Sequence, residues 1–352
     1  MNADTLHVEV HASAFPAQRL DDLRRALAAR DLAGKWLYES PAQAQAWLDY
    51  HAAWSPSRTD PALAALYGRA AAAALEPAGG RRGLHLVSLG CGGGHKDAAL
   101  LALPAAQRTG GARHYTPLDI SPSLVLTAAT LVSATHATIA QPGAAPPPGG
   151  PAGPPALRIH PLVADLGHWP ALGPWLDAQD GGRVRRLVTC YGLLPNFEPA
   201  PLLAWLAGLL RPGDGLLLAA NLSPGGHAAD AERIVAQYDN PHALRWYTLL
   251  LEHVGLPREA ARLRVTTAPL RDDGGAWCIE AHAVLRGALE PTLAGQTLHL
   301  APGERWRLFY SNRFTAQALA AALDAAHLAL RRHWLHADGE EGIFLCERAP
   351  GA

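Results

Sequence analysis

The sequence has few cysteines, no excess of charge of either sign and no long apolar run. Four cysteines in 352 residues form no CxxC pair and have no histidine partner at zinc spacing, so a zinc site is not expected and reduced thiols in a cytoplasmic protein are favoured. Thirty Lys and Arg balance 31 Asp and Glu, which argues against a nucleic-acid partner. We predict no membrane span, because no unbroken run of about 18 apolar residues exists, and no signal peptide, because residues 1–15 lack a basic region followed by an apolar one.

The most informative pattern is the sequence LHLVSLGCGGGHK at residues 84–96. Its apolar start predicts a buried parallel strand, and its glycines allow the backbone to turn with positive φ and to approach a ligand closely. A second strand at 114–118 ends in Asp119, and an acid at that strand tip can accept hydrogen bonds from a ribose diol. Strand, glycine loop, helix, strand and acid together predict a nucleoside cofactor site.

Strand-like stretches recur at the spacing of an α/β protein and alternate with helical ones. The predicted strands are 84–90, 114–119, 157–164, 184–191 and 215–221, and the predicted helices between them are 96–103, 122–135, 169–178 and 201–210. This order predicts a doubly wound parallel sheet. The Pro/Gly-rich stretch 141–155 is interpreted as a surface insertion.

Two further regions fall outside this alternation. Residues 1–67 are helical in character, and 227–305 begin with two helices, 229–238 and 241–254, and continue with strands near 263–268, 277–285 and 297–300. The chain ends with a helix at 315–326 and strands at 329–335 and 342–347, a pair that suits the antiparallel edge of a methyltransferase sheet. We therefore predict a cofactor-binding core formed by 68–226 and 306–352, and a smaller α+β substrate-binding lobe formed by 1–67 and 227–305.

The glycine pattern alone does not choose between cofactors, because enzymes that bind NAD carry a similar loop. Three features favour S-adenosylmethionine. Asp165, followed by Leu166, comes after the third strand and can accept a hydrogen bond from an adenine amino group. Lys96 lies just inside the first helix and could pair with a methionine carboxylate. The fourth strand ends at Tyr191 and leads to Asn196, at a strand tip where methyl acceptors are held.

Taken in chain order, these segments resemble the histidine-specific S-adenosylmethionine-dependent methyltransferase family, whose best-known member methylates the α-amine of histidine in ergothioneine synthesis. The matching segments are KWLYESP, SPSRTD, VSLGCGGGHK, YTPLDIS, VADL, LLPNFEP, LRPGDGLLLAANL, QYDNPHALRW, WCIEAHAVL and YSNRFT. Of these, QYDNP and the KWLYES-to-SPSRTD pair are the most specific. The resemblance implies a class I methyltransferase fold, S-adenosylmethionine as cosubstrate and a small-molecule substrate. The histidines show no metal-ligand spacing, so we expect no metal, and we expect a monomer or homodimer.

The resemblance also implies roles for individual positions. The residues expected at the cofactor are Gly90, Gly92, Lys96, Asp119, Asp165, Leu166 and Tyr191. The residues expected at the acceptor are Tyr38, Trp54, Asn196, Tyr238, Phe309 and Ser311. Among these, Asn196 and Tyr38 are the predicted catalytic pair, and Asn196, Tyr38 and Tyr238 are expected to hold the amino and carboxylate groups of an amino acid.

Two departures from the family pattern bear on the substrate. Family members read imidazole partly through a Glu-x-Ser pair, whereas this chain has Phe309 before Ser311, and a pocket tyrosine is replaced by Trp54. Both changes remove hydrogen-bonding groups and add apolar area. The sequence therefore predicts an amine acceptor other than histidine, such as a less polar or aromatic amino acid or another small zwitterion.

Two alternatives stay open at this point. The first is a nicotinamide-dependent oxidoreductase, which is disfavoured by the helix directly after Asp119 and by the antiparallel end of the sheet. The second is a catalytically silent S-adenosylmethionine-binding module. The absent glutamate permits that module, and the presence of Asn196, Tyr38 and Tyr238 argues against it.

Overall fold

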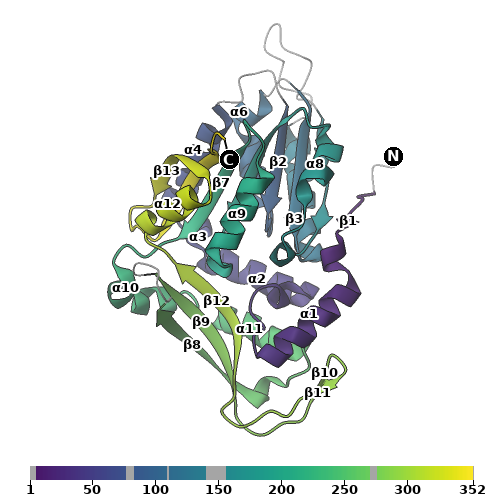
Figure 1. Cartoon of the computed structure of the whole chain (residues 1–352), viewed down its shortest axis with the longest axis vertical. Helices are drawn as coiled ribbons and strands as arrows, with labels where there is room; N and C mark the ends of the chain where they lie inside the picture. Colours follow the sequence, from purple (N-terminus) through teal and green to yellow (C-terminus); the bar gives the residue numbers. More distant parts are fainter. Residues whose placement is uncertain (1–4, 77–82, 109–110, 140–155, 270–275, 352) are drawn as a thin grey trace.

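The computed structural model describes residues 5–76, 83–108, 111–139, 156–269 and 276–351, which form two lobes (Figure 1). The larger lobe is built on a nine-stranded sheet in which β4 (Leu157–Ile159) pairs with β3 off the main path. In spatial order the path is β1 (Glu9–Val10), β5 (Leu162–Val163), β3 (Arg113–Asp119), β2 (Leu84–Leu89), β6 (Arg185–Tyr191), β7 (Gly215–Asn221), β14 (Glu341–Arg348) and β13 (Leu328–Leu335). Neighbouring strands are parallel except that β14 runs antiparallel to β7 and to β13. The predicted doubly wound sheet with a closing antiparallel pair is confirmed.

Both faces of this sheet are covered by helices, so its central strands are apolar on both sides. Along β2, Leu84 and Leu86 join the core on one face while Val87 and Leu89 join the core on the other. The first face packs on α4 (Pro61–Leu75), α5 (His95–Ala102), α6 (Pro104–Gln107) and α7 (Pro122–Ile139), and the second on α8 (Leu172–Asp180), α9 (Pro199–Leu209) and α12 (Ala316–Ala325). Within the described ranges, α7 alone has the length and mean hydropathy, 1.2, of a possible membrane span, and its Leu124, Val125 and Ala128 are buried against the protein.

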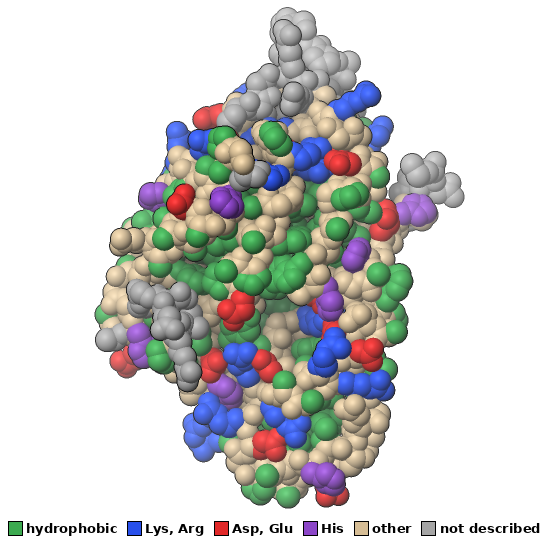
Figure 2. All heavy atoms as spheres, viewed as in Figure 1, with side chains coloured by type: hydrophobic (Ala, Val, Ile, Leu, Met, Phe, Trp, Pro, Cys, Tyr) green, Lys and Arg blue, Asp and Glu red, His purple; other side chains and the backbone are tan. Residues whose placement is uncertain are grey.

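The smaller lobe contains a three-stranded antiparallel sheet in the order β12 (Arg305–Arg313), β9 (Trp277–Leu285), β8 (Ala261–Pro269). Its core includes the fully buried Trp246, Trp277 and Trp306. The elements around this sheet are α1 (Pro16–Ala29), α2 (Pro41–Trp54), α3 (Pro56–Thr59), α10 (Gly226–Val235), α11 (Pro241–His253) and the hairpin β10 (Thr292–Leu293) and β11 (Gln296–Thr297). Figure 2 shows positive and negative side chains interspersed over this lobe on the face in view, in keeping with the balanced composition.

Strand β12 connects the two lobes. It pairs with β9 from Arg305 to Arg313. Just beyond its end, Phe314 N–H donates to Asn221 C=O at 3.4 Å and Ser223 N–H donates to Phe314 C=O at 2.9 Å. These bonds tie β12 to the carboxyl end of β7 (Figure 1). The smaller lobe is therefore anchored to the central sheet through the end of β12.

The structure differs from the sequence prediction in several places. The strand predicted at 157–164 is split into β4 and β5 around Pro161, which has no N–H to donate to a sheet. The strand predicted at 297–300 is reduced to β11. The expected boundary at 305/306 places β12 in the core, but β12 pairs with β9 in the smaller lobe, and β1, expected in that lobe, pairs with β5. The insertion predicted at 141–155 lies outside the described residues.

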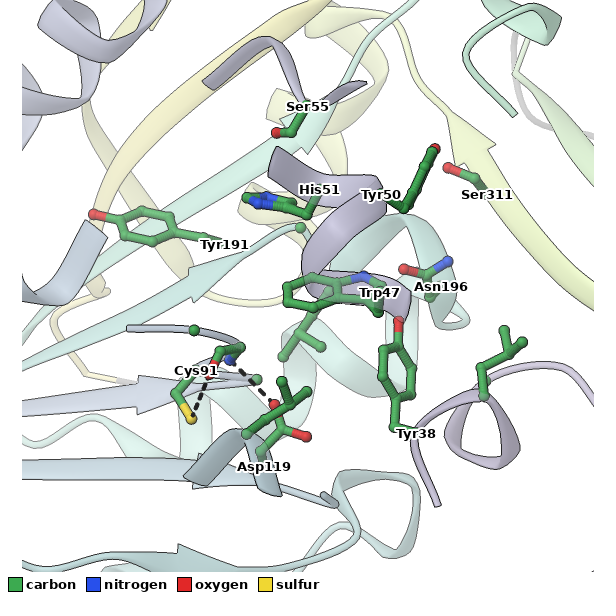
Figure 3. A pocket seen from close by; sticks show the side chains of 18 of the residues that line it. Tyr38, Trp47, Tyr50, His51, Ser55, Cys91, Asp119, Tyr191, Asn196 and Ser311 are labelled. Carbon is green, nitrogen blue, oxygen red and sulfur yellow. Dashed lines mark hydrogen bonds between the residues drawn. The ribbon is translucent and has the colours of Figure 1, made fainter. Parts of the chain in front are cut away.

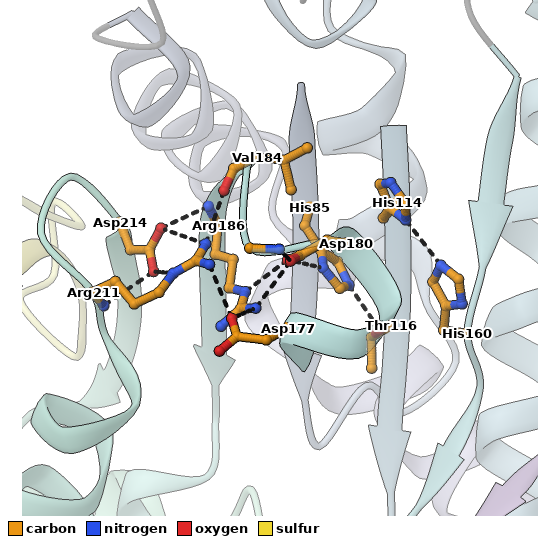
Figure 4. Close-up of polar contacts among 11 residues, drawn as sticks. His85, His114, Thr116, His160, Asp177, Asp180, Val184, Arg186, Arg211 and Asp214 are labelled. Carbon is orange, nitrogen blue, oxygen red and sulfur yellow. Dashed lines mark hydrogen bonds and ion pairs between the residues drawn. The ribbon is translucent and has the colours of Figure 1, made fainter. Parts of the chain in front are cut away.

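A buried polar network crosses the amino ends of the central strands (Figure 4). His85 Nδ1 lies 2.9 Å from Asp180 Oδ2 and His85 Nε2 lies 2.8 Å from Thr116 Oγ1, while Arg186 Nε donates to Asp180 at 2.8 Å. Burial lowers the pKa of His85, so its imidazole is neutral near pH 7. These bonds join β2, β3, β6 and the end of α8 on the side opposite the glycine loop, leaving the carboxyl ends of the strands for the site.

Candidate active site

The glycine loop follows β2 in a conformation that needs glycine. Gly90, Gly92 and Gly94 have φ values of 61°, 52° and 74°, in the left-handed region. A Cβ on Gly90 would lie 2.6 Å from Leu193 Cδ2, and a Cβ on Gly92 would lie 2.6 Å from the Trp47 ring. Helix α2 therefore lies directly over the loop, and side chains at these two positions would collide with Leu193 and Trp47.

Asp119 ends β3 beside this loop. Its Oδ2 accepts the Gly92 N–H at 3.2 Å and its Oδ1 accepts the Ser121 N–H at 3.0 Å, which fixes the carboxylate between the loop and the start of α7 (Figure 3). Burial raises the pKa of Asp119 to about 6 in spite of these backbone hydrogen bonds. When ionised, the carboxylate accepts with both oxygens and donates with neither, which suits the two hydroxyl donors of a ribose diol.

Asp165 follows β5 and is buried in the same cavity, but it has more partners than the sequence predicts. Its oxygens accept Gly167 N–H at 2.8 Å and His168 Nδ1 at 2.9 Å, and Lys35 Nζ forms an ion pair with it and with Asp22. Asp22, Asp165 and His168 have ligand atoms close enough to hold a metal ion, and the Lys35 ammonium already contacts both carboxylates. An adenine amino group would have to share an Asp165 oxygen with these donors.

A group of basic side chains lines the cavity near the start of α5. Lys96 Nζ lies 4.3 Å from the centre of the Tyr67 ring and 5.5 Å from that of Tyr191, so it is held by cation–π contacts. Arg58 on α3 and His51 on α2 line the same region. Burial, reinforced by the charges of Lys96 and Arg58, lowers the pKa of His51 to about 3. In the part of the chain that the structure describes, no carboxylate is within the 4.0 Å ion-pair limit of Arg58 or Lys96, although Glu341 and Asp97 line the cavity and interact with Lys96 at longer range.

Asn196 lies at the opposite end, in the short 3-10 helix Leu194–Asn196 after β6. Its side-chain Nδ2 donates to Tyr310 C=O at 2.5 Å, and the Tyr310 hydroxyl donates to Asn196 C=O at 2.7 Å. Because the amide nitrogen is committed to Tyr310, the amide oxygen is directed toward Trp47 and Tyr38 (Figure 3). The Tyr38 hydroxyl points into the same space, and burial raises the pKa of Tyr38, so it stays protonated.

Aromatic rings form the wall between these groups. The Tyr38 ring centre lies 6.0 Å from that of Trp47 and 5.4 Å from that of Trp246, and the Phe309 ring centre lies 5.4 Å from that of Tyr238. Phe309 is 6% exposed, whereas Trp54 is 38% exposed and donates to His242 Nδ1 at 3.2 Å. Phe309 thus belongs to the wall and Trp54 to the rim.

The predicted site residues all converge on one cavity of about 900 Å³ between the lobes, within the size range of small-molecule sites. This includes Leu166, Ser311 and every other residue expected at the cofactor or the acceptor. Sequence reasoning missed Trp47, Arg58 and Arg313. Arg58 was within reach because it lies in the SPSRTD segment already singled out, whereas nothing in the local sequence marks Trp47 as a cover for the glycine loop.

Comparison with known proteins identifies the family. A sequence model described as histidine-specific methyltransferase, SAM-dependent, matches residues 20–348. The chain belongs to this family. A histidine N-alpha-methyltransferase of Mycobacterium tuberculosis (strain CDC 1551 / Oshkosh) is 26% identical over 283 residues, which cover 75% of this chain and 75% of that protein.

Two solved structures illustrate the range of similar folds. An S-adenosylmethionine-dependent methyltransferase from Clostridium acetobutylicum ATCC 824 is 9% identical, with a TM-score of 0.44, and the match covers 86% of this chain and 99% of that one. The Burkholderia thailandensis 1,6-didemethyltoxoflavin-N1-methyltransferase, solved with 1,6-didemethyltoxoflavin and S-adenosylhomocysteine bound, is 15% identical, with a TM-score of 0.38 and coverage of 88% and 91%.

Membership of this methyltransferase family confirms the class I Rossmann-like fold and S-adenosylmethionine as cosubstrate, and it decides against the nicotinamide alternative. The residues present fit that molecule. The loop at Gly90 and Gly92 lines the cavity with its backbone in the left-handed conformation, Asp119 offers an acceptor for a diol, and Lys96 with Arg58 offers positive charge for a carboxylate. When bound, S-adenosylmethionine supplies a methyl group carried on a positively charged sulfur.

Proposed function

We propose that this chain methylates the amine of a small zwitterion, most simply an amino acid other than histidine. The observation that carries the proposal is the orientation of Asn196. Its amide oxygen faces the cavity because its nitrogen is bound to Tyr310 C=O, and the cavity continues from there to the glycine loop. An acceptor oxygen held rigidly in front of a cofactor pocket suits an N–H donor.

The cavity residues orient the amine. Asn196 Oδ1 accepts one N–H and so directs the nitrogen lone pair, while the protonated Tyr38 hydroxyl is available for a second hydrogen bond. The aromatic wall of Tyr38, Trp47 and Trp246 excludes water and tolerates positive charge through the faces of the rings. A general base is not built into this wall, so the amine must lose its proton before or during binding.

We expect an acceptor other than histidine because Phe309 offers no hydrogen-bond partner to an imidazole. This side chain is buried among Tyr238, Trp246 and Tyr247, where the family resemblance leads us to expect a glutamate. An imidazole placed there would lose a hydrogen-bond partner, which costs about 1–3 kcal/mol for a buried polar group. An apolar or aromatic side chain would instead gain buried area. The 26% identical relative supports an amine as acceptor, and Phe309 supports a different side chain.

The test is a panel assay. The purified full chain is incubated with methyl-labelled S-adenosylmethionine and each common amino acid, together with simple amines, and products are identified by mass. We expect N-methylated products, with higher kcat/KM for apolar or aromatic amino acids than for histidine. Preference for histidine would contradict the choice of substrate, and labelling of no amine would favour the silent binding module. We expect the active species to be a monomer or a homodimer.

A further inference from the structure

Arg313 is a buried cation at the acceptor end of the cavity with no ion-pair partner among the described residues. Phe309, Ser311 and Arg313 are spaced two apart on β12, and all line the cavity. Arg313 is 2% exposed, its Nη2 donates to the Tyr238 hydroxyl at 2.8 Å, and its Nε has no partner. Arg186, buried to a similar degree, has its Nε 2.8 Å from Asp180 Oδ2.

The groups around Arg313 offer hydrogen-bond donors. Asn221 Nδ2 lies 3.5 Å from both the Tyr238 hydroxyl and Ser311 Oγ, and those two hydroxyl oxygens are 3.4 Å apart. The Tyr238 oxygen accepts from Arg313, so its own proton remains available for another acceptor. This corner, formed by Asn221, Tyr238, Ser311 and Arg313, is therefore positive and rich in donors.

A buried guanidinium is costly unless an anion and good hydrogen bonds compensate it, and its planar shape matches a carboxylate. We propose that Arg313, with Tyr238, binds the carboxylate of the acceptor, so that the enzyme requires an amine that also carries a carboxylate. The inference rests on the proposed function and deepens it. Asn196 would take the amine end, Arg313 the carboxylate end, and the wall around Phe309 the side chain.

The first test compares three ligands that share the same side chain and differ at the carboxylate position: phenylalanine, phenylalaninamide and phenethylamine. Their binding to the complex of the full chain with S-adenosylhomocysteine is measured by calorimetry, and kcat/KM is measured with S-adenosylmethionine. We expect the acid to exceed the amide by about 100-fold, the order set by hydrogen bonds to a charged group. The amide retains its amine, so the comparison isolates the negative charge. Equal values for acid and amide overturn the proposal.

The second test uses variants of strand β12. Arg313→Gln should reduce the preference for acid over amide to less than about 10-fold, mainly through KM, while Arg313→Lys should retain most of it. Arg307→Gln is the matched control, because Arg307 pairs with Asp31 and Glu280 and is not among the residues that line the cavity. Unchanged binding of S-adenosylhomocysteine shows that a variant is folded. A full preference for the acid in Arg313→Gln overturns the proposal.

The two proposals fail in different ways. If no amine is methylated but phenylalanine binds more tightly than its amide and Arg313→Gln removes the difference, the proposed function fails and the carboxylate site stands. If amines without a carboxylate are methylated equally well, the function stands and the role of Arg313 fails. Thermal stabilisation by chloride that depends on Arg313, without any preference for the acid, means that the corner holds a small inorganic anion and also overturns the carboxylate assignment.

Discussion

The protonation of Asp119 should control the affinity for the nucleoside cofactor between pH 5 and pH 7. Burial raises the pKa of this carboxyl to about 6, and the diol of the ribose needs its ionised form as acceptor. Affinity should therefore approach its full value above about pH 7, be half of it near pH 6, and be lost as the pH falls further. With a pKa of about 6, about ten in eleven Asp119 side chains are ionised at pH 7 and about one in eleven at pH 5, so the Kd should rise about 10-fold.

The assay is calorimetry with S-adenosylhomocysteine from pH 5 to pH 8 at constant ionic strength, with circular dichroism to show that the chain stays folded. Asp119→Asn should weaken binding at pH 7 by about 10-fold or more, because hydrogen bonds to a charged group contribute about 1.5–3 kcal/mol. It should also abolish the dependence on pH over this range.

Asp97 provides the control for this experiment. Burial raises its pKa to about 6 as well, and it also lines the cavity, but its carboxylate is occupied as acceptor of the Tyr115 hydroxyl at 2.7 Å. Asp97→Asn should therefore retain the dependence on pH. A Kd that is constant from pH 5 to pH 8 in the unmodified protein, or the same profile after Asp119→Asn, would refute the role assigned to Asp119.

Three further outcomes are expected at other points of the cavity. Asn196→Leu should lower kcat/KM for the amine by about 100-fold and leave S-adenosylhomocysteine binding within twofold, since only the acceptor loses a hydrogen bond; equal loss of both would contradict its placement. Phe309→Glu should shift kcat/KM toward histidine relative to phenylalanine in the panel assay, and an unchanged ratio would count against the exclusion of histidine. Gly92→Ala should destabilise the fold by about 1–3 kcal/mol in denaturant unfolding. Adding Trp47→Ala should recover part of that loss, because the new Cβ would meet the Trp47 ring; strictly additive effects would show that backbone strain alone is responsible.

The sequence was sufficient for the parts of the fold that depend on local pattern. The apolar run at 84–89 is buried along its whole length, and β7 and β9 have the bounds that alternation and turn residues predict. The positions of Gly90 and Asp119 also followed, because a parallel strand must end at the same edge as its neighbour. These inferences needed only residues close together in the chain.

The remaining features depend on contacts between distant segments. Strand β12 reads RWRLFYSNR, which mixes charged and apolar residues without clear alternation, and its pairing with β9 is set by tertiary packing. Arg313 is recognisable as a site residue only once Tyr238 lies beside it and no carboxylate does. In the same way, the sequence around Asp165 gives no sign that its carboxylate forms an ion pair with Lys35, which lies 130 positions earlier.

The attachment of β12 to the end of β7 has a mechanical consequence. Ser311 and Arg313 lie next to the bonds between Phe314 and the Asn221–Ser223 segment, so their position is fixed relative to the central sheet. The cover of the glycine loop is not fixed to the central sheet in this way, because it consists of helix α2 and its Trp47, which lie outside the sheet. A cosubstrate bound at the glycine loop would therefore lie beneath α2, whereas the acceptor corner is fixed to the central sheet.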